Sequence, residues 1–407
     1  MLTATVTFIS SLRPGHPDFL DLPWDQPLEK WVGLCPRLED LPVGLSRHPV
    51  VFVSYPEGLY ALKELPEQLA EKEYNLLRQI EEKHLPVVQP VGQVILAKRS
   101  VLITRYLDHS LPYRSLFLRQ SLKGYRNSLL DAIASLLVQL HLAGVYWGDC
   151  SLSNALFRRD AGALQAYLVD AETSEIHETL SDSLRSYELD VMEENISGSL
   201  ADLAAMGALP EDYPIFETGA YIRERYEHLW KEINREEIVR KEETYRIQER
   251  IRALNTLGFS VDEVVLQPAS DGERLRMRAQ VTDRSFHKEM LHALTGLEAE
   301  EQQARKMMNE IQELRAHLVN QNNRSTPVSV AAYKWLNETY QTVLDTIKSK
   351  QMQADPLELY CQVLEHKWYL SEQAAQDVGH QKALEDYLTH ILPSSTELSP
   401  PLENEKD

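Results

Sequence analysis

Cysteine, glycine and long apolar runs are scarce in this sequence, and each shortage excludes a class of protein. The 407 residues include only three cysteines, which lie far apart at Cys35, Cys150 and Cys361. Their spacing matches neither a zinc site nor a disulfide framework. With 16 glycines and 20 prolines, the chain is neither collagen-like nor of low complexity. No apolar run is long enough for a bilayer, so we expect no membrane span.

Basic residues are scarce relative to acidic ones. The chain has 42 Lys and Arg against 62 Asp and Glu, which gives a formal net charge of −20. Because nucleic-acid surfaces need clustered Lys and Arg to hold phosphates, we expect no nucleic-acid partner. The first residues also lack the basic segment of a signal peptide. We therefore expect a location in the reducing cytoplasm, which suits an odd number of scattered cysteines.

The chain contains enough apolar residues for several packed cores. Hydrophobic residues make up 43% of it and charged residues 26%. In the N-terminal part, β-rich segments flank the turn residues Pro56-Glu57-Gly58, and an amphipathic segment follows Pro66. The predicted order there is strand, strand, helix, strand, strand, at residues 50–53, 59–63, 67–83, 87–95 and 100–106.

The remainder of the chain is predicted to be mainly helical, with two short β segments. Trp335, Trp368 and Tyr369 are expected to anchor the C-terminal helices to the rest of the chain. The end of the chain, rich in Ser, Pro and acidic residues, is expected to be disordered. The predicted elements are helices at 121–143, 216–256, 284–320 and 328–390, short strands at 155–158 and 166–170, and a small β region at 261–281.

One segment carries residues typical of phosphoryl transfer. A helix ends at Gly144, the next loop presents Asp149 and then Asn154, and a short strand ends at Asp170. In such a set one carboxylate orients the attacking hydroxyl. The other carboxylate and the amide oxygen hold Mg²⁺ against the nucleotide phosphates. The protein then contributes mainly position and charge neutralisation.

This segment resembles the catalytic loop and metal-binding strand of the protein-kinase-like superfamily. Its Gly148-Asp149 pair is similar to the His-Gly-Asp version of aminoglycoside, choline and lipopolysaccharide (Kdo) kinases. The resemblance implies that Asp149 is the catalytic base. It implies that Asp170 is the principal metal ligand and Asn154 a second one. Glu172, in place of the usual glycine, is a candidate third ligand.

Upstream residues occur in the order that this superfamily has. Lys63 resembles the lysine of the third strand, which binds nucleotide phosphates, and Glu73 resembles its partner glutamate on the following helix. The resemblance covers roughly residues 40–200 and implies ATP and Mg²⁺ as cofactors. It also implies an adenine-binding hinge at Arg105, Tyr106 and Leu107.

Over its whole length the chain resembles an uncharacterised bacterial family. That family joins such a kinase-like region to a C-terminal domain of unknown function. The C-terminal part of this resemblance is the segment His366-Lys367-Trp368-Tyr369-Leu370-Ser371-Glu372.

Several departures from the superfamily pattern leave alternatives open. Trp147 replaces the loop histidine, so the loop backbone must be supported from elsewhere. Ser151 stands where protein kinases keep a phosphate-directed lysine, which counts against a protein substrate. The glycine-rich phosphate loop is missing, and only Gly44-Leu45-Ser46-Arg47-His48 offers a substitute. One alternative is therefore a catalytically weak or inactive pseudokinase scaffold that binds a protein partner through its C-terminal helices. A third hypothesis is that the chain transfers something other than a phosphoryl group, as in adenylylation with the nucleotide bound in reverse.

The leading hypothesis is an ATP- and Mg²⁺-dependent phosphotransferase. Its acceptor would be a hydroxyl of a small molecule or a lipid-linked sugar. The predicted fold class is α+β: a two-lobed kinase-like fold, with a small antiparallel sheet plus helix and then a mainly helical lobe, followed by a mostly helical C-terminal extension. The predicted units are an N-terminal extension (1–36), the first lobe (37–107), the second lobe (108–258), the C-terminal domain (259–392) and the tail (393–407).

Overall fold

The chain divides into two compact units. The first contains Met1–Leu118, Tyr125–Arg158 and Gln165–Arg235, and the second contains Arg119–Gly124, Arg159–Leu164 and Glu236–Asp407. The predicted domain boundary at 258/259 and the predicted tail from 393 lie outside the described residues. The computed structural model describes residues 8–41, 47–97, 99–118, 123–207, 209–210, 212–235, 237–240, 263–268, 274–280, 285–322, 326–349, 355–374 and 376–391.

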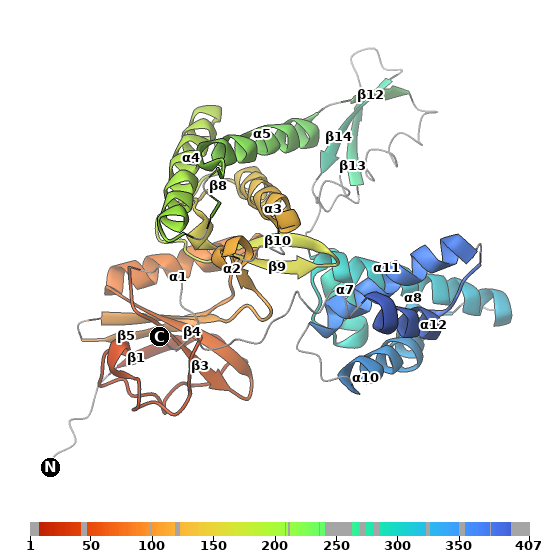
Figure 1. The fold of residues 1–407 in the computed structure, drawn as a ribbon, viewed down its shortest axis with the longest axis horizontal. Helices are drawn as coiled ribbons and strands as arrows, with labels where there is room; N and C mark the ends of the chain where they lie inside the picture. Colours follow the sequence, from red (N-terminus) through yellow and green to blue (C-terminus); the bar gives the residue numbers. More distant parts are fainter. Residues whose placement is uncertain are drawn as a thin grey trace. The chain divides into compact units, whose positions relative to one another are not determined.

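A six-stranded antiparallel sheet begins the first unit (Figure 1). The predicted hairpin is present, because β3 pairs with β4 across a turn at Pro56 and Glu57. β6 pairs with β4 on its other side and with β5. The strand order is β1 (Ile9–Leu12), β5 (Pro90–Leu96), β6 (Arg99–Arg105), β4 (Gly58–Leu65), β3 (Val50–Tyr55) and β2 (Leu38–Glu39).

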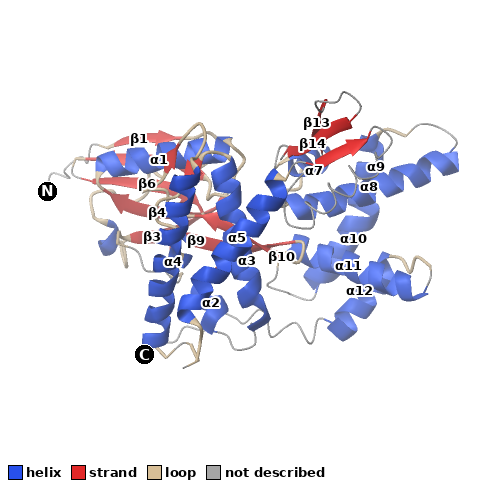
Figure 2. Ribbon diagram, turned by 90° about the horizontal axis from the view of Figure 1, so that it is seen from above, coloured by secondary structure: helices blue, strands red, loops and turns tan. Residues whose placement is uncertain are grey.

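Side chains along β4 alternate between the two faces of the sheet. Tyr60 and Leu62 are buried in a core that they share with the N-terminal extension. Because successive strand side chains point to opposite faces, Lys63 points to the other face of the sheet. Helix α1 (Glu67–Glu82) packs along that face against β4, β5 and β6 (Figures 1 and 2).

The N-terminal extension covers the opposite face and one edge of the sheet. Strand β1 pairs with β5, which the sequence did not predict because the strand is short and largely exposed. Phe19, Trp24 and Trp31 are buried against the sheet. Each indole N–H is satisfied, since Trp24 donates to the Phe19 carbonyl and Trp31 to the Gln26 carbonyl.

The rest of the first unit is mainly helical. The predicted apolar helix is present as α3, and the predicted short strands are present as β9 and β10. Helices α4 and α5 pack against each other. The elements are β7 (Leu111–Pro112), α2 (Tyr113–Leu118), α3 (Lys123–Leu142), β8 (Val145–Tyr146), the 3₁₀ turn η3 (Leu152–Asn154), β9 (Ala155–Asp160), β10 (Ala163–Leu168), β11 (Glu175–Ile176), α4 (Asp182–Ala205) and α5 (Ile215–Asn234).

The predicted helix at 216–256 is confirmed only as far as Asn234, because residues 237–240 form a strand, and residues 241–256 lie outside the described residues. Helix α5 ends at Asn234, Arg235 is already extended, and strand β12 begins at Glu237. The charge pattern continues without a break, so it gives no stop signal. Ile238 and Val239 are β-branched, and they pair with β14, which lies far along the chain.

The second unit combines a small antiparallel sheet with a group of helices. The predicted β region at 261–281 is present as β13 and β14, and its predicted turn at Asp271-Gly272 lies outside the described residues. The helical core is centred on Met307, Trp335 and Tyr360. The elements are β12 (Glu237–Arg240), β13 (Glu263–Pro268), β14 (Arg274–Gln280), α7 (Phe286–Thr295), α8 (Glu301–Asn322), α9 (Val328–Lys334), the π-helical η4 (Trp335–Tyr340), α10 (Gln341–Ser349), α11 (Pro356–Ala374), α12 (His380–Asp386) and the π-helical η5 (Tyr387–Ile391).

The prediction that aromatic residues anchor the C-terminal helices holds for Trp335 only. Trp335 is buried, whereas Trp368 and Tyr369 are 65% and 51% exposed. The buried residues of α11 lie between Glu358 and Val363, in the first half of that helix. Trp368 and Tyr369 lie in the second half of α11. The prediction that they are buried, which rested on their size, is therefore wrong.

The tip of the β9–β10 hairpin, residues 159–164, belongs to the second unit. The Asp160 carboxylate accepts backbone N–H bonds from Gln302 (3.1 Å) and Gln303 (2.9 Å), in the first turn of α8. It therefore caps that helix. Glu358 of α11 accepts the next two backbone N–H groups of the tip, at 2.8 Å each.

Within the described part of the chain, no helix combines the length and the apolar character needed to cross a bilayer. The predicted α+β fold class is confirmed: a sheet-bearing lobe and a mainly helical lobe are followed by a mostly helical C-terminal part.

Candidate active site

Lys63 joins two carboxylates that are far apart in the sequence. Its Nζ lies 3.1 and 3.0 Å from the two carboxylate oxygens of Glu73 on α1. The same Nζ lies 2.7 Å from Oδ2 of Asp170, a residue 107 positions further along the chain. The side chains predicted to bind phosphate and metal therefore meet, from the sheet-bearing lobe and the helical lobe of the first unit.

Local structure explains why Glu73 faces Lys63. Glu73 lies on the buried face of α1, three residues after Ala70 and four before Leu77. Only 1% of Glu73 is exposed. A carboxylate on an apolar helix face needs a charged or hydrogen-bonding partner. Lys63, on the sheet face covered by α1, is that partner.

The charges in this group influence one another. Burial and the negative charge of Asp170 raise the pKa of Glu73 and the Lys63 ammonium lowers it, and the net result is a pKa of about 7. Burial alone would lower the pKa of Lys63. The carboxylates of Glu73 and Asp170 outweigh burial and raise it. Lys63 is therefore a stable cation between Asp170 and a glutamate that titrates near neutral pH.

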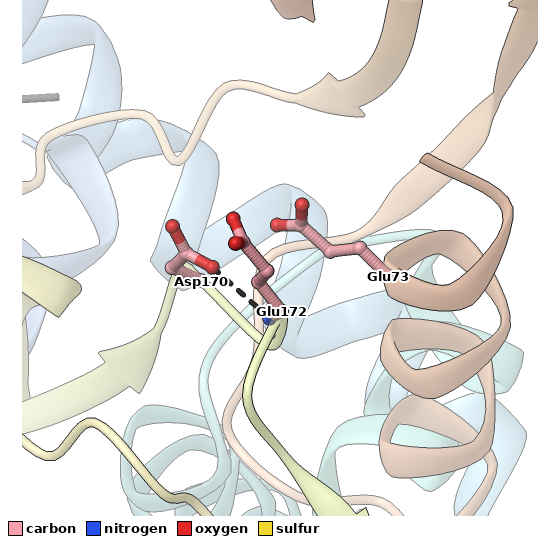
Figure 3. Close-up of side chains that lie close together, drawn as sticks. All are labelled: Glu73, Asp170 and Glu172. Atoms are coloured by element: carbon pink, nitrogen blue, oxygen red, sulfur yellow. Dashed lines mark hydrogen bonds between the residues drawn. The ribbon is translucent and has the colours of Figure 1, made fainter. Parts of the chain in front are cut away.

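Glu172 faces the same space as Asp170 and Glu73 (Figure 3). Ligand oxygens of Glu73, Asp170 and Glu172 all lie within 4.8 Å of one another. The Glu172 backbone N–H donates to Oδ1 of Asp170 at 3.0 Å, the bond dashed in Figure 3. A Glu172 carboxylate oxygen lies 4.0 Å from Lys63 Nζ and 3.6 Å from His48 Nε2. We call Lys63, Glu73, Asp170 and Glu172 the site cluster.

The donor set of the site cluster suits a hard divalent cation. All three acids offer carboxylate oxygens, which Mg²⁺ prefers as ligands. Each oxygen of Asp170 accepts one hydrogen bond, from Lys63 or from the Glu172 backbone. A carboxylate oxygen has a second lone pair, so both oxygens can still coordinate a cation.

The predicted base, Asp149, is held between two side-chain amides. Nδ2 of Asn154 donates to the Asp149 carbonyl at 3.0 Å and to Oδ2 of its carboxylate at 3.1 Å. Nδ2 of Asn195, from α4, donates to the other carboxylate oxygen, Oδ1, at 2.9 Å. The sequence did not predict Asn195. The available signal was an Asn inside a helix, a position where its propensity is unfavourable.

The Asn154 side chain has only one sensible orientation. Both of its partners on Asp149 are acceptors, so its NH₂ group must face them. Its carbonyl oxygen, Oδ1, is consequently turned the other way. An amide oxygen is a ligand type that Mg²⁺ accepts, and the role of Asn154 as a metal ligand stays a prediction.

A buried network supports the loop before Asp149. The Gly148 N–H donates to Oε1 of Glu188 at 2.6 Å, and the other oxygen of Glu188 lies 2.7 Å from His141 Nε2. His141 Nδ1 contacts the Tyr226 hydroxyl at 2.7 Å. His141 is thus a satisfied core histidine. Glu188 supplies the loop support that the missing loop histidine would have given.

Trp147 links the loop to the segment that carries Asp170. Its indole is fully buried, and Nε1 donates to the Asp170 carbonyl at 3.3 Å. The next residue, Gly148, has φ +84°, and a Cβ there would lie 2.6 Å from the Thr173 carbonyl. Only glycine fits such a close approach. The loop and the Asp170 segment are therefore packed as one piece.

The predicted hinge begins at the last residue of β6, the strand next to the one that carries Lys63, and continues into the segment after it. Arg105 is opposite Tyr60, three positions along β4 from Lys63. The Arg105 N–H donates to the Gln89 carbonyl, and the Tyr106 N–H donates to the Leu59 carbonyl. An adenine base would have to displace these bonds to use either donor. The Leu107 carbonyl accepts from Ser110.

The candidate phosphate loop is described only in part. Residues 44–46 lie outside the described residues, Arg47 is exposed, and His48 is close to Glu172. Ser151, in the place of the lysine of protein kinases, lies with its hydroxyl 2.9 Å from that of Ser153.

Two family models match different parts of the chain. Residues 57–208 match the sequence model of the lipopolysaccharide kinase (Kdo/WaaP) family. Residues 228–392 match a family described as a domain of unknown function, DUF4032. The predicted resemblance to a Kdo-type kinase joined to a domain of unknown function is thus confirmed. Residues 57–208 are therefore similar to lipopolysaccharide kinases.

Other comparisons add little to these matches. No curated protein matches the chain. Among solved structures, a chain described as WaaP in complex with acyl carrier protein is 14% identical, with a TM-score of 0.36. The match covers 61% of this chain and 99% of that one.

Proposed function

We propose that the first unit is an ATP- and Mg²⁺-dependent phosphotransferase. Its acceptor is a hydroxyl group of a small molecule or a lipid-linked sugar. The observation that carries the proposal is the position of Lys63 Nζ, 2.7 Å from Asp170 and 3.0 Å from Glu73. The match of residues 57–208 to the Kdo/WaaP kinase family supports it independently.

Lys63 and the neighbouring oxygen ligands hold the nucleotide. The Lys63 ammonium binds the α- and β-phosphates, and Glu73 keeps it in place. Asp170, Asn154 and Glu172 provide carboxylate and amide oxygens for Mg²⁺. When bound, the cation neutralises charge on the transferring phosphoryl group. The hinge at Arg105, Tyr106 and Leu107 is the proposed adenine site, where the base would displace the backbone bonds of the Arg105 and Tyr106 N–H groups.

Asp149 orients the acceptor. Each of its carboxylate oxygens accepts one amide hydrogen bond and keeps another lone pair for an acceptor hydroxyl. The hydroxyl oxygen bonds to the γ-phosphorus as the bond from that phosphorus to the ADP oxygen breaks, and the hydroxyl proton passes to Asp149. Ser151, in place of the lysine of protein kinases, favours a small or sugar acceptor over a protein. The printed family name, lipopolysaccharide kinase, also favours a sugar.

Two further parts of the proposal concern location and partners. The three cysteines are all free and buried, which fits a reducing cytoplasm. The exposed aromatic residues Trp368 and Tyr369 on α11 support a protein partner for the C-terminal helices. An inactive scaffold is less favoured, because the lysine, its glutamate and the metal-ligand carboxylates converge.

The test is phosphate transfer from ATP to candidate hydroxyl acceptors, including a Kdo-terminated sugar. Asp149→Asn and Asp170→Ala should each lower turnover, with a loss of about 10²–10⁴-fold for the base. Asp202→Asn, an exposed acid on α4, is the matched control and should leave turnover unchanged. Turnover that neither site change affects would exclude this mechanism.

A further inference from the structure

Helix α4 presents two polar side chains to the loop that carries Asp149. Glu188 and Asn195 are seven residues apart, so they lie on the same face of the helix, about two turns apart. Neighbours on that face, such as Leu189, Met192 and Ile196, are buried and apolar. Two polar residues on an otherwise apolar face indicate specific partners.

The two polar residues hold different parts of the loop. Glu188 accepts the backbone N–H of Gly148, so it fixes the main chain before Asp149. Asn195 donates to Oδ1 of the Asp149 carboxylate at 2.9 Å and to the Cys150 carbonyl at 3.3 Å. Since both partners of Asn195 are acceptors, its NH₂ group must face the loop.

Asn195 and Asn154 together hold both oxygens of the Asp149 carboxylate. Asn154 donates to one oxygen of Asp149, and Asn195 donates to the other. A carboxylate with one such bond can still rotate about its side-chain torsions, whereas two bonds on opposite oxygens fix its plane. The free lone pairs then point in one direction, which matters because small errors of position cost large factors in rate.

We propose that Asn195 is a positioning residue for phosphoryl transfer, which orients the Asp149 carboxylate toward the acceptor hydroxyl. This inference rests on the proposed function of the same site. Asn195 lies on α4, and its hydrogen bonds are to the catalytic loop and to Ser199 of its own helix. Its loss should therefore reduce kcat and leave nucleotide binding intact.

The experiment compares Asn195→Ala with wild type and with Glu194→Gln, a change at the exposed neighbouring position of α4. Asn195→Ala should lower kcat by about 10–10²-fold. The KM for ATP and the rise in Tm with Mg-ATP should stay within about twofold of wild type. Asn195→Gln should recover part of the loss, because it keeps the amide donor.

The split between kcat and the KM for ATP is a signature that a purely structural role would not give. An unchanged kcat for Asn195→Ala, or a fall in kcat matched by loss of Mg-ATP binding, would overturn the proposal.

A crystal structure of Asn195→Ala separates this inference from the proposed function. We expect an unchanged loop backbone, held by Glu188, with the Asp149 carboxylate turned away or in more than one orientation. An Asp149 carboxylate that keeps its wild-type position overturns the positioning role, whatever the activity. If wild type transfers no phosphate to any acceptor, the proposed function fails, and the orientation of Asp149 still decides the role of Asn195.

Discussion

Each unit contains a group of three acids, and the two groups differ in exposure. The acids of the site cluster are Glu73, Asp170 and Glu172. A second group of acids in the other unit, here called the tip cluster, contains Asp160, Glu300 and Glu358. Burial raises the pKa of Glu73 to about 7, with Asp170 adding to the effect. Burial raises the pKa of Asp160 to about 7 as well, with Glu300 adding to it. A raised pKa among acids therefore does not distinguish the two clusters.

The partners of the acids do distinguish them. In the tip cluster both oxygens of Asp160 accept hydrogen bonds from backbone N–H groups. Glu358 accepts bonds from two further backbone N–H groups and from the side-chain amide of Gln303. In the site cluster the central partner is a lysine side chain. Asp170 and Glu172 remain 31% and 28% exposed. Acids closed off by backbone donors stabilise a fold, whereas acids that reach solvent beside a cation can bind a ligand.

Among changes to the two clusters, the largest effect should come from removing the Lys63 cation of the site cluster. Lys63→Met should lower phosphate transfer by about 10²–10³-fold, because it removes a charge that stabilises the transferring phosphates. It should also abolish the rise in Tm with Mg-ATP. Turnover and a thermal shift measure the two effects. Lys83→Met, at an exposed position after α1, should change neither. Full activity of Lys63→Met would mean that the two clusters do not differ in function.

The tip cluster should affect stability instead. Asp160→Ala removes the cap of α8 and leaves the backbone N–H groups of Gln302 and Gln303 without their acceptor. The free energy of unfolding should fall by about 1–3 kcal/mol. Urea unfolding measures the change. Glu372→Ala, an exposed acid on α11, serves as the control and should unfold like wild type. An unchanged midpoint for Asp160→Ala would contradict a structural role.

The raised pKa of Asp160 gives a pH dependence of defined sign. Between its ordinary value of 3.8 and about 7, folded Asp160 keeps its proton while the unfolded chain has released it. The folded state then binds more protons, so its contribution to stability falls as pH rises through this range. Asp160→Asn does not titrate and lacks this fall.

The measurement is the free energy of unfolding of both proteins from pH 4 to pH 8. The stability of Asp160→Asn relative to wild type should rise between about pH 4 and pH 7 and then level off. Glu73→Gln should show the same sign, between 4.5 and about 7. A relative stability that is flat with pH would show that these acids are not protonated in the folded state.

The smallest effect should be that of Glu172, which sharpens the definition of the site cluster. Glu172→Gln removes a negative charge and keeps one oxygen ligand, so the Mg²⁺ concentration for half-maximal turnover should rise about 3–10-fold, near or below 1.4 kcal/mol. Titration of Mg²⁺ at saturating ATP measures it. Glu175→Gln, at an exposed position nearby, should leave the Mg²⁺ dependence unchanged. An unchanged Mg²⁺ dependence for Glu172→Gln would show that Glu172 is not a metal ligand.

The sequence predicted the parts of the fold and site that depend on local pattern. The hairpin that contains Lys63, the helix that carries Glu73 and the strand before Asp170 all follow from short-range signals such as alternation and turn residues. Their meeting was predicted by resemblance, because no local signal places Lys63 beside a residue 107 positions away.

The features that were missed depend on distant partners. Asn195 and Glu188 contact the catalytic loop from 46 and 40 positions away, and Asp160 caps a helix 142 positions away. The end of α5 was missed because β12 forms by pairing with β14 and not by its own composition. Trp368 showed that a large aromatic residue on a helix is not necessarily buried.

The most direct measurement of the central claim is a crystal structure with Mg²⁺ and a non-hydrolysable ATP analogue. The account predicts phosphates on Lys63, the metal on Asp170 and Asn154, and the γ-phosphate facing Asp149. A nucleotide bound elsewhere, or none at all while Lys63 stays paired with Glu73 and Asp170, would contradict it.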